Sequence, residues 1–168
     1  MAGTNRYHYF VEGTCEQKLL TVLKEQKNLI VPGTIDVFNV TQKKITDLKI
    51  RTLPYNIIAI LVFDTDKPNV DMLNANLAKL KRSAQVKEIW CVLQVPNLEG
   101  ELQRSTALKD IKKLFGCEGR EEFKEKFIKE RNLYKKLLDA GFRLEKMWSI
   151  DGDGDYGKIK NDGYRIKN

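Results

Sequence analysis

The sequence predicts an α/β protein in which helices flank a parallel sheet, followed by a helical carboxyl-terminal part. Three observations lead to this fold class. Apolar segments of strand length alternate with helical patterns over the first two thirds of the chain. The run from Ile57 to Phe63 is apolar without interruption, which is typical of a strand covered on both faces. The last third has helical periodicity instead.

The first elements follow from short patterns near the amino terminus. Tyr7 to Val11 is aromatic and β-branched, which predicts a strand. Thr14-Cys15-Glu16-Gln17 has the pattern of a capping box, and apolar residues at helical spacing extend the expected helix to about Lys27. Alternation over Ile35 to Val40 predicts a second strand, and a short polar helix is expected over Thr41 to Arg51.

The middle of the chain continues the alternation of strands and helices. After the apolar run, a helix is expected to begin near Pro68, and Ile89 to Val95 is the next buried strand. The elements expected after it are one or two helices over Leu98 to Phe115, a single helix over Glu121 to Ala140 with Gly141 as its C-cap, and a last strand over Leu144 to Ile150.

The length and hydropathy are those of one globular domain. We expect this domain to span residues 1–150 of the 168, with a tail over 151–168 that is a loop or partly disordered because it is rich in glycine and charge. No apolar run approaches the roughly 20 residues that span a bilayer. The polar amino terminus lacks the apolar segment of a signal peptide, so a cytoplasmic location without membrane attachment is expected.

The charge balance favours a polyanionic partner. The chain has 30 basic and 23 acidic residues and a net charge of +7, which makes nucleic acid the simplest expectation, with a solvated basic surface as the alternative. Three widely spaced cysteines and one histidine leave little material for a zinc site. A hard cation held by carboxylates fits the composition better.

Two acidic motifs come directly after predicted strands. Glu12 follows the first strand, and Asp64-Thr65-Asp66 follows the apolar run. Because parallel strands place their carboxyl ends at one edge of the sheet, we expect these motifs to converge. Asp64 and Asp66 point to the same side of extended backbone, where their carboxylates repel each other unless a cation lies between them. Helix capping by the aspartates, and a favourable helix-dipole contact of Glu12, are the structural alternatives.

These motifs resemble a known family. Tyr9-Phe10-Val11-Glu12-Gly13-Thr14-Cys15-Glu16, followed by Leu61-Val62-Phe63-Asp64-Thr65-Asp66, is similar to the Toprim domain over roughly residues 7 to 100. That family includes topoisomerases, primases, OLD-family nucleases and small bacterial defence or RNA-processing nucleases. The first motif, with its second glutamate, looks most like the OLD and RloB-like branches.

The resemblance implies site residues and a reaction. Glu12 would match the glutamate that does acid–base work or binds metal, and Asp64 and Asp66 would match the metal-binding aspartates. Glu16 would match a second glutamate, and Glu99 is a candidate ligand of a second metal. The implied activity is hydrolysis of nucleic-acid phosphodiesters with Mg²⁺ or Mn²⁺, because the chain has no room for the further domains of topoisomerases and primases.

Basic residues are candidates for contacts with nucleic acid. Lys67, next to Asp66, could contact a phosphate. Arg131, Lys135 and Lys136 lie on the basic side of the expected long helix, where a solvated helix face is the alternative. OLD-type nucleases work with an ATPase, and this chain has no glycine-rich Walker loop, so an ATPase partner subunit is a further expectation.

Three rival interpretations stay open at this point. The strand followed by Asp64-x-Asp66 also resembles HAD-type phosphotransferases, although that family carries the motif on its first strand. Asp151 to Asp155 invites a calcium-loop interpretation, but an EF-hand requires glycine where Tyr156 stands. The third is a non-catalytic nucleic-acid-binding or assembly subunit with a Toprim-like fold.

Overall fold

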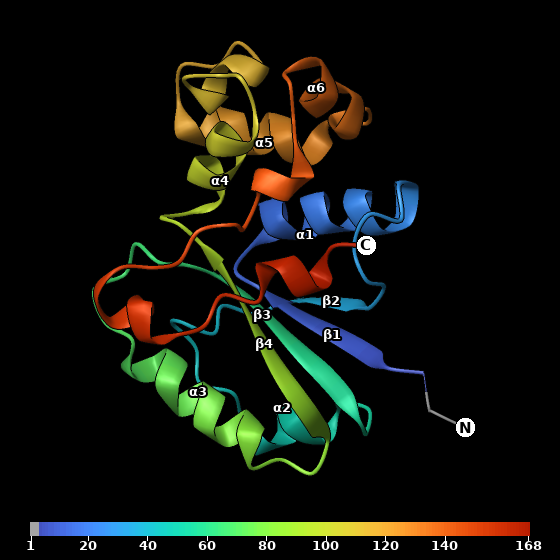
Figure 1. Cartoon of the computed structure of the whole chain (residues 1–168), viewed down its shortest axis with the longest axis vertical. Helices are drawn as coiled ribbons and strands as arrows, with labels where there is room; N and C mark the ends of the chain where they lie inside the picture. The colour runs from blue at the N-terminus through green and yellow to red at the C-terminus, as the bar shows by residue number, and fades with distance from the viewer. Residues whose placement is uncertain (1–3) are drawn as a thin grey trace.

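The computed structural model describes residues 4–168 and has an α/β fold built on one sheet of four parallel strands (Figure 1). Residues 1–3 of the polar amino terminus lie outside the described residues. The strands are adjacent in the order β2-β1-β3-β4, and each neighbouring pair is parallel. Their bounds are Arg6–Val11 for β1, Thr34–Val37 for β2, Ile57–Asp64 for β3 and Val86–Gln94 for β4.

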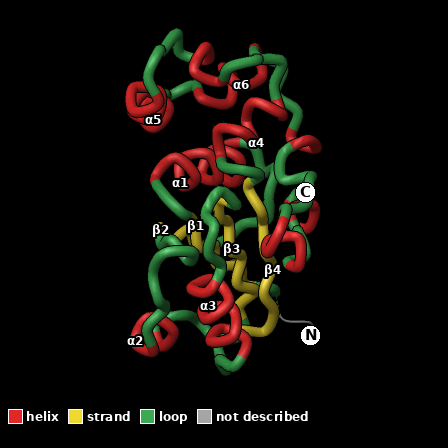
Figure 2. Tube along the Cα trace, turned by 90° about the vertical axis from the view of Figure 1, so that its left-hand side faces the viewer, coloured by secondary structure: helices red, strands yellow, loops and turns green. Residues whose placement is uncertain are grey.

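Within the described residues, six α-helices flank this sheet, so the predicted fold class is confirmed. They are α1 (Thr14–Thr21), α2 (Asp47–Arg51), α3 (Asp71–Lys81), α4 (Leu98–Ser105), α5 (Arg120–Lys129) and α6 (Leu133–Asp139). A π-helical turn, Val22–Gln26, extends α1. The helices α4, α5 and α6 lie together beyond the carboxyl ends of β3 and β4, at the top of Figures 1 and 2. No helix within residues 4–168 is long and apolar enough to cross a membrane.

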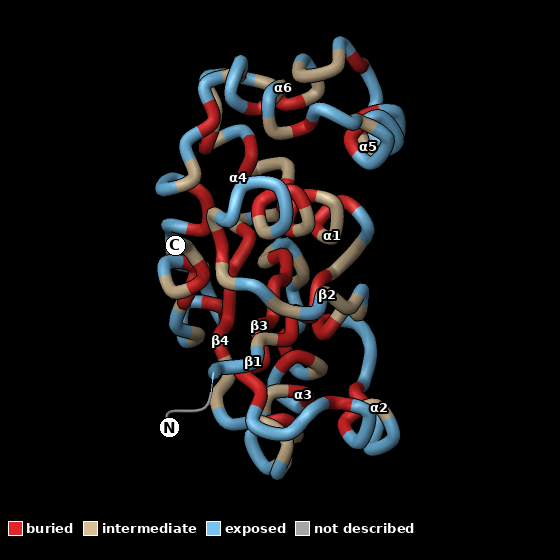
Figure 3. Tube along the Cα trace, turned by 90° about the vertical axis from the view of Figure 1, so that its right-hand side faces the viewer, coloured by how far each residue is buried: buried red, intermediate tan, exposed pale blue. Residues whose placement is uncertain are grey.

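The core has two layers because β3 is buried on both faces. Ile58, Ile60 and Val62 pack into the layer that contains α1, α4, α5 and α6. The alternate residues of β3, including Leu61 and Phe63, pack into the layer beneath α3. Figure 3 shows the strands as buried, whereas exposed residues gather on the outer helices such as α5. This double burial explains the uninterrupted apolar run in the sequence.

The expected helix over Glu121 to Ala140 is wrong as a single element. It is two helices, because Glu130 adopts extended backbone between α5 and α6. Phe123 and Phe127 of α5 are buried, and so are Leu133 and Leu137 of α6. In one straight helix a residue ten positions later is turned by about 80° from the first, so the break lets both apolar pairs reach the core.

The expected last strand is also wrong, whereas the tail consists of loops and 3₁₀ turns that pack on the rest of the protein. Leu144 to Ile150 contains a 3₁₀ turn, Leu144–Lys146, and no strand. The tail packs along the outer edge of β4, where Asp162 Oδ2 accepts from the Cys91 N–H (3.1 Å) and Asn161 Oδ1 accepts from the Leu93 N–H (3.3 Å). Side chains of the tail thus take the place of a further strand beside β4. They accept hydrogen bonds from backbone N–H groups that would otherwise be unpaired at the edge of the sheet.

Other boundaries moved by a few residues. The second strand ends at Val37, earlier than expected, and turns replace most of the polar helix that was predicted before Asp47. The helix expected near Pro68 begins at Asp71, and only Leu98–Ser105 of the segment to Phe115 is α-helical. A second 3₁₀ turn, Ile111–Leu114, completes that segment, and Gly154–Lys158 and Gly163–Ile166 are 3₁₀ turns of the tail.

Candidate active site

A polar cleft of about 380 Å³ lies at the carboxyl ends of β1 and β3, below the helices α4 and α5. The expected convergence of the acidic motifs is found here, although they are separated by about fifty residues in the sequence. The charged side chains that line the cleft are Glu12, Glu16, Asp64, Asp66, Lys67, Glu99, Arg120 and Lys124. All five acidic site residues expected from the sequence, and Lys67, therefore border one cavity.

A direct hydrogen bond joins the two acidic motifs. The backbone N–H of Asp64 donates to Glu12 Oε2 at 2.9 Å. The sheet makes this contact possible, because Val11, the last residue of β1, is paired with Val62, so Glu12 follows the end of β1 beside the last residues of β3. Glu12 is therefore held by the backbone of β3, whatever the protonation of the Asp64 side chain.

Gln94 organises the buried side of the cleft. It is the last residue of β4 and pairs with Asp64 in the register of the sheet. Its Nε2 donates to Asp64 Oδ1 at 2.7 Å and to Glu16 Oε1 at 3.2 Å. Its Oε1 accepts from the indole N–H of Trp148 at 3.4 Å. One fully buried amide thus bridges two carboxyl groups, while the tryptophan fixes its orientation.

Two carboxyl groups of this cleft, those of Asp64 and Glu16, have raised pKa values. Burial raises the pKa of Asp64 to about 8, and the nearby carboxylates of Glu12, Glu16 and Asp66 act in the same direction. Burial also raises the pKa of Glu16, with additional repulsion from Glu12 and Glu99. A cation among these groups would remove the repulsion and favour their ionised forms.

Arg120 places a positive charge at the mouth of the cleft. It begins α5, and its guanidinium binds Glu99 through Nε–Oε1 (2.9 Å) and Nη2–Oε2 (3.4 Å). The hydrogen bond to Glu99 raises the pKa of Arg120, and the charges of Asp64 and Asp66 raise it further. A guanidinium in this position presents donors of the geometry that suits a phosphate.

The donor chemistry of the cleft fits a hard divalent cation. Within residues 4–168, no group of three or more His, Cys, Asp or Glu side chains is placed to hold a metal ion as it stands. Mg²⁺ needs fewer protein ligands, because it usually keeps several waters and binds one or two carboxylates. Asp64 and Asp66 supply that number, with Glu12 beside them, whereas Glu99 is occupied by Arg120.

The remaining basic residues expected to bind nucleic acid lie elsewhere. Arg131 is in the break between α5 and α6, Lys135 pairs with Asp139 at 2.7 Å, and Lys136 Nζ lies 5.7 Å from the centre of the Phe115 ring. None of the three is among the residues that line the cleft. They belong to α6 and the turn before it, within the helical cap that α4 to α6 and the segments between them form.

Tyr156 is a neighbour of the cleft that the sequence did not indicate. Its side chain is buried, its ring lies 6.3 Å from that of Phe63, and its hydroxyl has no hydrogen-bond partner among the described residues. Burial raises its pKa, and the charges of Asp66, Glu12 and Asp64 add to the effect. The aspartates around it, Asp151, Asp153 and Asp155, are exposed.

Comparisons with protein-family models, with curated proteins and with solved structures find no match for this chain. The resemblance to the Toprim domain therefore stays an expectation based on two short motifs.

Proposed function

We propose that this protein is a Toprim-like nuclease that hydrolyses nucleic-acid phosphodiester bonds with Mg²⁺, or with Mn²⁺ in its place. The observation that carries the proposal is the convergence of Glu12, Asp64 and Asp66 in one polar cleft at the carboxyl ends of adjacent parallel strands. This is the edge of an open α/β sheet where ligands bind. The net charge of +7 supports a polyanionic substrate.

The side chains of the cleft divide into two groups by their chemistry. Asp64 and Asp66 would hold the cation, with Glu12 as a further ligand or as a general base. When bound, the cation would polarise a phosphoryl oxygen and lower the pKa of its bound water. Lys67 and Arg120, which line the same cleft, would bind the phosphate that the carboxylates alone would repel.

The buried amide of Gln94 has a positioning role in this proposal. Its two hydrogen bonds keep the carboxyl groups of Asp64 and Glu16 in fixed places while the cleft is without a cation. Once a cation binds, both carboxyl groups are expected to be ionised, and the amide donates to them as charged acceptors. Such support from behind the ligands is typical of metal sites that hold a defined geometry.

A non-catalytic nucleic-acid-binding or assembly subunit is the second candidate. It is favoured by the pairing of Glu99 with Arg120 and by the absence, within residues 4–168, of three acidic or other ligand side chains already grouped around one point. An ATPase partner that rearranges the cleft would be compatible with either candidate. Only the first candidate requires the protein to cut nucleic acid.

The test is cleavage of labelled DNA and RNA during titration with Mg²⁺ and Mn²⁺. We expect the wild type to cut at least one of them, and the Asp64→Ala, Asp66→Ala double variant to be slower by roughly 100-fold or more, because bound metal supplies several kcal/mol of transition-state stabilisation. The matched control is the Asp153→Ala, Asp155→Ala double variant, which removes an exposed pair of the same spacing from the tail.

The control distinguishes the loss of the cleft aspartates from the loss of any two carboxylates of the protein. Equal loss of activity in both double variants would contradict a site at Asp64 and Asp66. A wild type that binds nucleic acid but leaves it intact under every metal condition would favour the non-catalytic subunit.

A further inference from the structure

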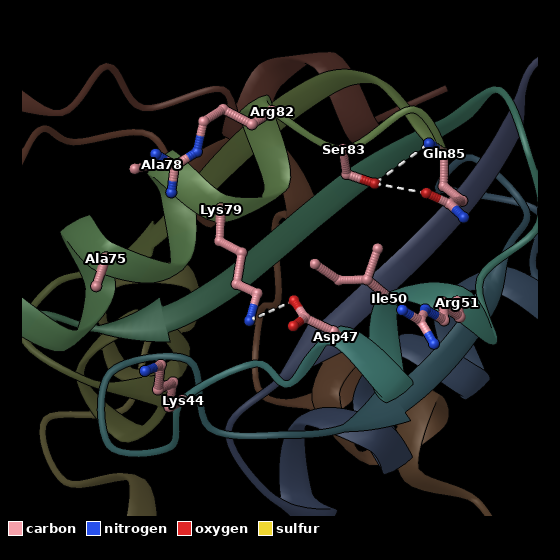
Figure 4. Close-up of a pocket in the computed structure, with 10 residues that line it drawn as sticks. All are labelled: Lys44, Asp47, Ile50, Arg51, Ala75, Ala78, Lys79, Arg82, Ser83 and Gln85. Atoms are coloured by element: carbon pink, nitrogen blue, oxygen red, sulfur yellow. Dashed lines mark hydrogen bonds and ion pairs between the residues drawn. The ribbon is translucent and has the colours of Figure 1, made fainter.

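A second hollow, of about 760 Å³, lies between α2 and α3 on the face of the sheet that these helices cover. Figure 4 shows its lining residues, which are Lys44, Asp47, Ile50, Arg51, Ala75, Ala78, Lys79, Arg82, Ser83 and Gln85. We call it the basic groove. Its four cationic side chains face a single carboxylate, so the groove has an excess of positive charge.

Most of this positive charge is not neutralised inside the protein. Asp47 Oδ1 binds Lys79 Nζ at 2.8 Å, and this pair accounts for one of the four cations. Within residues 4–168, Lys44, Arg51 and Arg82 take part in no ion pair, and all three are exposed. Figure 4 shows them around the Asp47–Lys79 pair, with no ion pair joining any of them to Asp47. The groove therefore presents three unpaired cations to an external anion.

The floor of the groove allows a polymer backbone to approach closely. Ala75 and Ala78 face it from α3, and their small side chains leave the helix surface accessible between the flanking cations. Ser83 and Gln85 add a hydroxyl and an amide at the far end, joined by a hydrogen bond of 2.8 Å. Long cationic side chains over a shallow floor suit a chain of phosphates, which needs charge more than apolar contact.

One segment of the chain connects the basic groove with the carboxylate cleft. Asn39 and Gln42 line the cleft, and Lys44, a few residues later, lines the groove. Asn76 of α3 fixes this segment, because its Nδ2 donates to the carbonyls of Val40 and Lys43 at 2.8 Å each. A ligand that leaves the cleft over this segment would enter the groove.

The two cavities lie at opposite ends of β3. Asp64 is the last residue of this strand, whereas Gln85 of the groove accepts a hydrogen bond through its carbonyl from Ile57, the first residue. At about 3.3 Å per residue, the strand separates the two ends by roughly 23 Å. One strand of a duplex has a phosphate every 3.4 Å or so, which makes this span about seven nucleotides.

We propose that the basic groove binds the sugar-phosphate backbone of a nucleic-acid strand, over a stretch that reaches as far as about seven nucleotides from the phosphate in the carboxylate cleft. That the polymer is nucleic acid rests on the proposed function. The groove would hold the part of the substrate that lies outside the carboxylate cleft. Lys44, Arg51 and Arg82 are the residues that carry the contact.

The experiment measures binding without catalysis. The protein would be titrated in EDTA into 5′-labelled nucleic acid, and binding would be measured by fluorescence anisotropy over a range of salt concentrations. The ligands would be 16-nucleotide oligo-dT, 16-nucleotide oligo-U and a DNA duplex. The test variant is Lys44→Gln, Arg51→Gln, Arg82→Gln. The control is Lys109→Gln, Lys113→Gln, Lys129→Gln, which removes the same charge from the helical cap at three exposed lysines that form no ion pair within residues 4–168. Thermal melting of both variants checks that they fold.

For the preferred polymer we expect the groove variant to bind on the order of tenfold more weakly at 0.1 M salt, or weaker still. The slope of log K against log salt should also fall in magnitude by about 2 for single strands, because three phosphate contacts are lost. The cap variant should stay close to the wild type. Oligo-dT and oligo-U distinguish DNA from RNA as the source of the phosphates.

Three results would overturn the proposal. These are equal weakening in the two variants, wild-type affinity in the groove variant, or displacement of the oligonucleotide by poly-glutamate at equal charge concentration. Failure of the nuclease proposal is separable, because cleavage is measured with metal and this binding without it. A protein that never cuts but shows the expected difference between the variants retains the groove as a nucleic-acid site.

Discussion

At the scale of single residues, burial and neighbouring carboxylates together raise the pKa of Asp64. Its folded-state pKa of about 8 lies well above its ordinary value of 3.8. Between these two pH values, the Asp64 carboxyl group is protonated in the folded protein and ionised in the unfolded chain. The stability that this proton contributes is therefore fully present below about pH 4 and is lost as the pH rises through about 8. Without a cation, the cleft therefore becomes a source of instability at alkaline pH.

The Asp64→Asn variant tests this assignment, because asparagine keeps the shape but does not ionise. In EDTA, we expect the melting temperature of the wild type to fall more than that of the variant between pH 5 and pH 9, by roughly 2 °C or more. Differential scanning fluorimetry across this pH range measures the difference. Melting curves that shift in parallel would show that Asp64 ionises normally in the folded protein.

At the scale of elements, the junction between α3 and the segment before α2 depends on one buried side chain. Asn76 is 1% exposed, donates to two carbonyls of this segment and accepts from the Ile45 N–H at 2.9 Å. The segment has little regular structure of its own, so these bonds hold the wall that the cleft and the basic groove share.

Substitution Asn76→Ala should lower the free energy of unfolding by about 3 kcal/mol, because it leaves buried backbone groups without partners. Asn74→Ala is the matched control on the same helix, where the side chain is exposed and a change within about 0.5 kcal/mol is expected. Urea denaturation of the two variants and the wild type gives both values. Similar effects from the two substitutions would contradict the role given to Asn76.

The elements also show which parts of the structure can be predicted from local sequence. The strand Ile57–Asp64 and the convergence of Glu12 with Asp64 follow from apolar patterning and from the geometry of parallel sheets. Gln94 and Arg120 could not be assigned to the cleft, because the sequence does not show which helix start or strand end packs against it. A polar residue inside the apolar run before Pro96 was the one available signal for Gln94.

For the whole molecule, the tail is part of the packed structure. Ile166 is fully buried, and Gly163 lies so close to Trp148 that a Cβ at this position would be 2.3 Å from its carbonyl oxygen. Trp148 in turn donates to Gln94, which contacts Asp64. The composition of the tail predicted a loop because glycine and charge dominate it, but tertiary contacts with β4 and Trp148 order it.

Substitution Gly163→Ala should therefore destabilise the protein by about 1–3 kcal/mol, as expected when atoms are forced into a packed position. Gly119→Ala is the control, because a Cβ there meets no atom within 4 Å and its φ of −103° is open to alanine. Chemical denaturation compares the two. A neutral effect of Gly163→Ala would show that the tail does not pack on Trp148 in solution.

The central claim is that the carboxylate cleft binds a divalent cation, and Mn²⁺ binding tests it without requiring the right substrate. Isothermal titration calorimetry of the wild type at about pH 8 should show saturable binding, accompanied by proton release because carboxyl groups with raised pKa values must ionise. The Asp64→Ala, Asp66→Ala variant should lose this binding, whereas the Asp153→Ala, Asp155→Ala variant should keep it. Wild-type protein that takes up no Mn²⁺, or equal binding by the Asp64→Ala, Asp66→Ala variant, would contradict the claim.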